Sequence, residues 1–131
     1  MVLLLICVLS GSYAPITEYP DGGGLVINEI MIDPLYSSTT AAGQWIELYN
    51  NSGSWINLSG WRIENQSGQT IEFSTILVPP QGYVLIGASS IEEENGGYTP
   101  QAVWSGFSLS PTGSLLLEDQ RLESQEFLSW N

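Results

Sequence analysis

Two stretches in which apolar and polar residues alternate constrain the fold of this chain more than any other feature. They lie between Gly24 and Trp61 and read GLVINEIMIDP and, after a spacer rich in Ser, Thr and Ala, QWIELYNNSGSWINLSGW. Alternation of this kind is typical of an extended strand with one face on a core and the other turned outward. Asn, Gly and Ser between the apolar runs are turn residues. The pattern predicts two strands, a hairpin loop, and a second hairpin that closes at Gly60 and Trp61.

Short apolar runs separated by turn residues continue to the end of the chain, and no stretch has a helical periodicity long enough to predict a helix. The expected strands are Leu25–Ile32, Gln44–Asn50, Ser54–Leu58, Trp61–Asn65, Thr70–Phe73, Ile76–Val78, Tyr83–Gly87, Ala102–Trp104, Ser114–Glu118 and Leu122–Trp130. Two long loops are expected at Asp33–Gly43 and Ser89–Gln101. Strands this short and this evenly spaced predict an all-β sandwich or barrel.

The charge of the chain excludes whole classes of partner. Its 131 residues fit one domain, and they carry fourteen acidic residues against two arginines, Arg62 and Arg121, with no lysine or histidine. A net charge of −12 repels the phosphate backbone of nucleic acids. The same charge repels anionic lipid surfaces. We therefore expect neither a nucleic-acid partner nor adsorption to an anionic membrane.

The N-terminus resembles an export signal. Met1–Leu9 is an apolar run followed by small residues, and it is too short to span a bilayer. No basic residue precedes it, so the start methionine carries the charge alone or the true start lies upstream. We expect a signal peptide at residues 1–14, a Pro/Gly-rich tether at 15–24 and a folded domain at 25–131, with a buried first strand as the alternative at the N-terminus. This predicts a secreted or cell-envelope protein with no membrane span in the mature chain. The single cysteine, Cys7, is removed with the signal.

The strand motifs themselves resemble those of the lamin tail domain family, in the form found in secreted bacterial proteins. The resemblance rests on an apolar-polar-Glu-apolar first strand, a W-I-E-L-x-N second strand and a hairpin that closes on Gly-Trp; the motif residues are Glu29, Trp45, Glu47, Leu48, Asn50, Leu58, Gly60 and Trp61. It implies an immunoglobulin-like β-sandwich of about eight or nine short strands. The lamin rod and the basic surface of some lamin tails are absent from this sequence, so a role as a nuclear scaffold is not implied.

Catalytic residues are not expected. Glu29 and Glu47 fall on strands that should be adjacent, and paired carboxylates can do acid–base work or hold a cation. The mature chain offers no His, Lys or Cys as a partner, however. A structural role at a sheet edge, for example through backbone N–H groups or an ion pair with Arg62, is favoured. We therefore expect a protein that is not an enzyme and holds no cofactor.

Two further hypotheses concern ligands. Glu92, Glu94 and Asn95 lie in an acidic, Gly-rich segment and are the candidate Ca²⁺ ligands, although the alternating acidic spacing of calcium loops is absent and a solvated loop is favoured. Tryptophan faces can stack on sugars. Trp45, Trp61 and Trp130 are expected in packing positions. Trp55 and Trp104 lie beside turns and are the better candidates for exposure, although a core position is favoured for each.

These observations favour an exported, non-catalytic module for interaction or surface attachment. It would act by protein–protein contact with a protein or cell-surface component, through a sheet face or an edge strand. Glu47 and Tyr49 would lie on that face if Ile46 and Leu48 point inward. The alternatives are a carbohydrate- or calcium-binding adhesin-type module and a fragment of a larger secreted hydrolase or nuclease.

Overall fold

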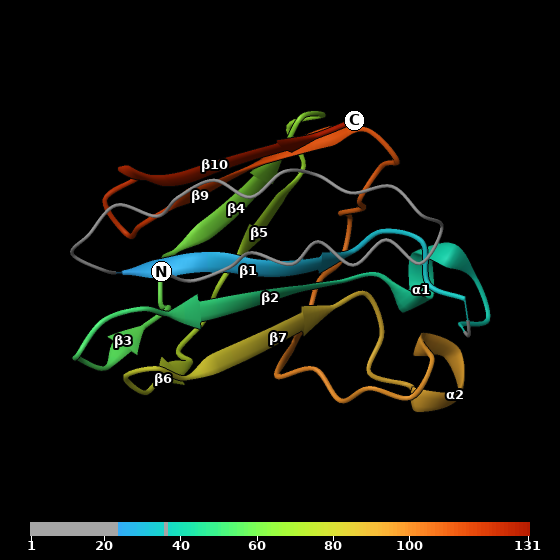
Figure 1. Cartoon of the computed structure of the whole chain (residues 1–131), viewed down its shortest axis with the longest axis horizontal. Helices are drawn as coiled ribbons and strands as arrows, with labels where there is room; N and C mark the ends of the chain where they lie inside the picture. Colours follow the sequence, from blue (N-terminus) through green and yellow to red (C-terminus); the bar gives the residue numbers. More distant parts are fainter. Residues whose placement is uncertain (1–23, 36) are drawn as a thin grey trace.

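Two four-stranded β-sheets pack face to face in the computed structural model of this chain, which describes residues 24–35 and 37–131 (Figure 1). The predicted signal peptide, nearly all of the predicted tether, and Cys7 lie outside the described residues. The described part holds ten strands and two short helices.

The first sheet has the strand order β1-β2-β7-β8. Its strands are β1 (Leu25–Met31), β2 (Trp45–Asn50), β7 (Tyr83–Gly87) and β8 (Ala102–Val103). The β1–β2 and β2–β7 pairs are antiparallel, whereas β8 joins β7 in parallel. A bulge between Ile27 and Glu29 shifts the register of β1 by one residue, so that Asn28 is the extra residue opposite β2.

The second sheet has the strand order β10-β9-β4-β5, and all of its pairs are antiparallel. Its strands are β10 (Ser124–Trp130), β9 (Gly113–Glu118), β4 (Arg62–Asn65) and β5 (Thr70–Glu72). A small third sheet, formed by β3 (Ile56–Asn57) and β6 (Leu77–Val78), lies at one end of the sandwich (Figure 1).

The core lies between the inner faces of the two large sheets. On the first sheet, alternate residues of β1 and β2 such as Ile27 and Ile46 are fully buried, and Ile63, Leu115 and Leu117 face them from the second sheet. Alternation of buried and outward residues in both sheets is the arrangement of an aligned β-sandwich. The predicted all-β sandwich is confirmed.

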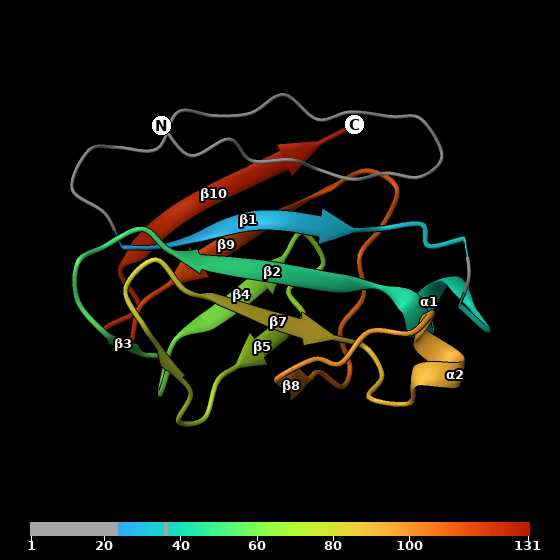
Figure 2. The same ribbon diagram turned by 60° about the horizontal axis from the view of Figure 1, so that its bottom comes forward.

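The two sheets also meet along one side, where the edge strands β1 and β10 lie next to each other (Figure 2). The backbone N–H of Ile27 donates to Oε2 of Glu126 at 2.5 Å. The edge of the first sheet is thereby bonded to a side chain of the second, which withdraws part of that edge from pairing with another chain.

Each of the two long segments expected to be loops contains one turn of helix. The helices are α1 (Thr40–Gly43) and α2 (Glu92–Asn95). Thr39 caps α1 by accepting from the N–H of Ala42 at 3.1 Å, and the N–H of Ser38 donates to the carbonyl of Glu94 at 2.7 Å, which joins the two segments. The expectation of loops without helix was wrong here, because one turn is too short to produce a periodic pattern. No helix within the described residues is long and apolar enough to cross a membrane.

Candidate interaction surface

The outward side of the first sheet, called the outer face below, carries the predicted surface residues. Ile46 and Leu48 are fully buried, so Glu47 and Tyr49 point to the opposite side, as the alternation predicted. Glu29 of β1 pairs with Glu47. On β7, Leu85 pairs with Glu47 and Tyr83 pairs with Tyr49, so both lie on the same side of the sheet. No described helix or strand lies over β1, β2 and β7 on this side (Figure 2).

One end of the outer face is formed by a pair of tyrosines. Tyr49 and Tyr83 are cross-strand neighbours whose ring centroids lie 4.7 Å apart at an interplanar angle of 34°. The hydroxyl of Tyr49 donates to Oε1 of Gln81 at 2.8 Å, which fixes its ring. Tyr49 is buried beneath these neighbours, whereas Tyr83 is 54% exposed. Tyr83 is therefore the residue of the pair that a partner can reach.

The middle of the outer face is acidic. Glu29 and Glu47 lie side by side, and burial together with the charge of Glu47 raises the pKa of Glu29. Glu47 accepts from Nδ2 of Asn28 at 2.7 Å, so the bulge residue holds this carboxylate in place. The suggested ion pair with Arg62 was wrong: Arg62 lies on β4 of the other sheet, where it pairs with Glu118.

The other end of the outer face is formed by Trp45 and Tyr98, whose ring centroids lie 6.4 Å apart in an edge-to-face arrangement. Tyr98 comes from the segment after α2, and its hydroxyl donates to the carbonyl of Gln44 at 2.9 Å. Burial raises the pKa of Tyr98 to about 12. A Cβ on Gly87 would lie 2.4 Å from the Tyr98 hydroxyl oxygen, so glycine is needed there for the ring to approach the sheet.

The candidate calcium ligands do not converge on a common point. Asn95 is buried, and its side chain donates to the carbonyls of Ser89 and Tyr98 and accepts from the N–H groups of Gly97 and Tyr98. Glu92 accepts from the Thr99 hydroxyl, and Glu94 accepts from that of Ser89. Within the described residues, no group of three or more acidic, His or Cys side chains is placed to hold a metal ion. Asn95 organises the chain after α2, and calcium binding stays a prediction.

Of the two tryptophans that were candidates for exposure, Trp55 is 64% exposed, so the favoured core position was wrong for this residue. Trp104 is only 7% exposed, so the core position favoured for it is confirmed. Beyond β8 the chain turns at Gly106, which has a φ of 62°, and Phe107 folds back against Trp104 with ring centroids 5.2 Å apart. Trp61 and Trp130 are buried, as expected.

The remaining residues of the strand motifs hold the fold together. Leu58 is fully buried, and Gly60 adopts a φ of 81° in the corner before Trp61. Asn50 is also fully buried, and its amide donates to the carbonyls of Ser54, Val78 and Pro79. The side chain of Asn50 therefore ties the end of β2 to the small β3–β6 sheet.

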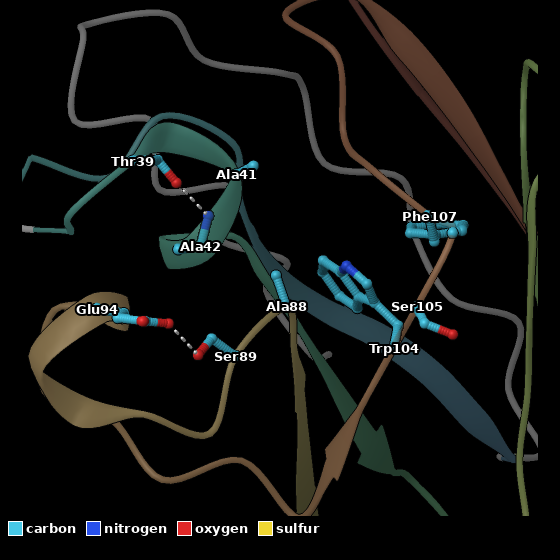
Figure 3. A pocket seen from close by; sticks show the side chains of 10 residues that line it. Thr39, Ala41, Ala42, Ala88, Ser89, Glu94, Trp104, Ser105 and Phe107 are labelled. Carbon is cyan, nitrogen blue, oxygen red and sulfur yellow. Dashed lines mark hydrogen bonds between the residues drawn. The ribbon is translucent and has the colours of Figure 1, made fainter.

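A cavity of about 410 Å³, absent from the predictions, opens between α1, α2 and the segment after β8 (Figure 3). Its walls include Ala42 and Ala88, and Glu94, Trp104 and Phe107 also line it. These residues come from three separate segments of the sequence, and neither their spacing nor their types mark them as neighbours. Only the packing of α1 against α2 brings them together.

These features define a small immunoglobulin-like β-sandwich with an aromatic and acidic outer face. Residues 19–126 match the family described as Lamin Tail Domain. The match covers most of the chain, and the chain belongs to this family, a family of immunoglobulin-like, non-catalytic domains. The resemblance predicted from the strand motifs is confirmed. A search of the curated proteins finds no match.

Proposed function

We propose that this protein is a non-catalytic interaction module that binds a protein partner through the outer face of its first sheet. The observation that supports this proposal most is the composition of that face, where aromatic pairs at both ends flank the carboxylates of Glu29 and Glu47. Membership of the lamin tail domain family agrees with a role in protein contact.

Tyrosine and tryptophan are the side chains that contribute most to protein interfaces, because they bury large areas at a small cost in side-chain entropy. On the outer face, neighbouring groups already fix the rings: Gln81 bonds to Tyr49, and Gln44 bonds to Tyr98. A partner that covers this face therefore meets side chains that lose little further freedom. The half-exposed carboxylates between the rings give the face a negative charge. They favour a partner with hydrogen-bond donors or positively charged groups opposite them.

We further propose that the module acts outside the cytoplasm, in a secreted or envelope-attached form. The apolar run of residues 1–9 followed by small residues supports this part. Its test is N-terminal sequencing of the protein recovered from the medium and from the cell envelope of the producing cells. A mature chain that begins after Ser12 or Ala14 is expected. A protein that is confined to the cytoplasm with residues 1–14 intact would contradict export.

The interaction itself is tested with a photo-crosslinking side chain at Tyr83 and, as a matched control, at Thr70 on β5 of the other sheet, which is also exposed. The crosslinked partner is identified by mass spectrometry and purified, and its Kd is measured by calorimetry. Tyr83→Ala is expected to raise Kd about tenfold or more, as the loss of an exposed aromatic residue that anchors an interface does, whereas Thr70→Ala leaves Kd unchanged. Equal crosslinking from both sheets, or an unchanged Kd for Tyr83→Ala, would contradict the proposal.

A further inference from the structure

The cavity between α1 and α2 lies at the end of the first sheet, where β7 leaves the sheet at Ala88 (Figure 3). Its volume of about 410 Å³ falls within the range of cavities that hold small ligands or single side chains. The side chains of Ala41, Ala42 and Ala88 supply small apolar walls, and Glu94 supplies a carboxylate at the opening. The cavity is thus open to solvent, and it combines small apolar side chains and the hydroxyl-bearing residues Thr39, Ser89 and Ser105 with one acidic group.

Trp104 presents a hydrogen-bond donor in this cavity. The residue is more than nine-tenths buried, and its indole ring extends toward Ala88 between Phe107 and α1 (Figure 3). No acceptor within the described residues bonds to its Nε1–H, whereas the equivalent group of Trp130 donates to the carbonyl of Ser110 at 3.0 Å. The indole nitrogen is not among the buried atoms left without a partner, so this N–H reaches the solvent of the cavity and is free to donate. A ligand with a carbonyl or hydroxyl oxygen in the cavity would accept a hydrogen bond from it.

Glu94 is an exposed carboxylate whose bond to the Ser89 hydroxyl is long, at 3.2 Å. The two arginines of the chain cannot neutralise it, because Arg62 pairs with Glu118 and Glu64, and Arg121 pairs with Asp119 and Glu123. Glu92 and Glu93 add two more negative charges on the same helical turn. In a chain with a net charge of −12, this end of the sheet repels anions and attracts cations.

We propose that the cavity receives an arginine or lysine side chain of the partner protein. The alanine walls contact the aliphatic part of that side chain, and the Glu94 carboxylate accepts from its cationic head. The Trp104 indole N–H donates to a backbone carbonyl of the same partner segment. This inference rests on the proposed function, since it gives the chemistry of the partner at the end of the outer face.

The probe is a capped pentapeptide with one arginine between glycines, and the matched control peptide has the neutral isostere citrulline in its place. Both are titrated into ¹⁵N-labelled protein while the tryptophan indole signals are followed by NMR. The Trp104 signal is assigned by its loss in Trp104→Phe. The arginine peptide is expected to shift this signal saturably, and the citrulline peptide to bind about threefold more weakly, as an exposed ion pair allows.

Two variants remove the same charge at different places. Glu94→Gln is expected to raise the Kd of the arginine peptide about threefold, whereas Glu72→Gln, on β5 of the other sheet, leaves it unchanged. Equal effects of the two variants would mean that only the overall charge matters, and would overturn the inference. A Trp104 shift with methyl glucoside but not with the arginine peptide would identify a sugar site and overturn it as well.

The two proposals fail in distinguishable ways. If Tyr83→Ala abolishes partner binding but the arginine peptide leaves the Trp104 signal in place, the outer face binds the partner and the cavity inference is wrong. If the arginine peptide binds at Glu94 while Tyr83→Ala has no effect on the partner, the cavity inference stands and the outer face is the wrong surface.

Discussion

The side chain of Gln44 forms two hydrogen bonds with the backbone of Leu109, 65 residues away in the sequence. Its Nε2 donates to the carbonyl of Leu109 at 2.7 Å, and its Oε1 accepts from the N–H of Leu109 at 2.9 Å. Nε2 also donates to the carbonyl of Ile32 at 2.8 Å. One buried amide therefore satisfies three backbone groups and joins the start of β2 to the connection between β8 and β9.

Gln44→Leu keeps the apolar part of the side chain but leaves those three backbone groups without their partner. Each unsatisfied buried group costs about 1–3 kcal/mol, so we expect the free energy of unfolding to fall by about 3 kcal/mol or more. Urea unfolding followed by tryptophan fluorescence measures the change. The exposed Gln120 provides the control, because Gln120→Leu should leave the stability nearly unchanged. Equal stability of the two variants would contradict a structural role for Gln44.

Asn50→Ala is expected to destabilise the end of the sandwich that carries β3 and β6. The change removes the donors to three backbone carbonyls and the acceptor for the N–H and hydroxyl of Ser52. Loss of these buried bonds should lower the free energy of unfolding by about 2–4 kcal/mol. Asn57→Ala, at an exposed position on β3, is the control, and thermal unfolding of both variants measures the difference. Similar melting temperatures would contradict this assignment.

Gly87→Ala tests the close approach of Tyr98 to the first sheet. The added Cβ would lie 2.4 Å from the Tyr98 hydroxyl oxygen, so the ring must move away from Trp45 and give up its bond to the carbonyl of Gln44. We expect a loss of about 1–3 kcal/mol, as for other overpacked buried sites, and a changed Trp45 fluorescence. Gly53→Ala is the matched control, because nothing lies within 4 Å of its added Cβ. A Gly87→Ala variant as stable as Gly53→Ala would contradict the packing of Tyr98 described above.

The Glu29–Glu47 pair should make the protein more stable in mild acid than at neutral pH. Burial and the charge of Glu47 raise the pKa of Glu29 in the folded state, so the folded chain binds a proton more readily than the unfolded chain there. Stability therefore falls as the pH rises through the raised pKa of Glu29. Glu29→Gln should increase the free energy of unfolding at pH 7 and flatten its dependence between about pH 4.5 and 7. Denaturant unfolding at a series of pH values measures this, and a Glu29→Gln variant less stable than the unaltered chain at pH 7 would refute it.

Asp119 should have the opposite effect at lower pH. Burial alone would raise its pKa, but hydrogen bonds from the backbone N–H groups of Glu123 and Arg121, together with the Arg121 guanidinium, lower it. The unfolded chain then binds the proton more readily, so stability falls as the pH drops below the ordinary aspartate pKa of 3.8. Asp119→Asn should be less stable at pH 6 and should depend less on pH in this acid range. Asp33→Asn, which also removes one carboxylate, is the control.

The sequence predicted the sandwich and the inward positions of β2, because alternation depends only on neighbours along one strand. Ile46 and Leu48 were identified in this way. The ion-pair partner of Arg62 was not predicted, because it depends on the strand order. β4 lies beside β9, in the sheet that does not contain β1 and β2. The exposure of Trp55 was also missed, because this residue lies just before β3, outside any alternating run. The cavity could not be predicted at all, because it requires α1 and α2 to be placed against each other.

The adjacency of β1 and β10 has a mechanical consequence. The two strands run in the same direction, with the start of β1 at one end of the sandwich and the end of β10 at the other (Figures 1 and 2). A stretching force applied at Leu25 and Trp130 therefore pulls β1 along β2, and β10 along β9, parallel to the strand axes. The ladder hydrogen bonds of both pairs then resist extension together and are not opened one after another. If the domain were attached at these two positions, a stretching force would load its strand pairs in shear, the direction in which they resist most.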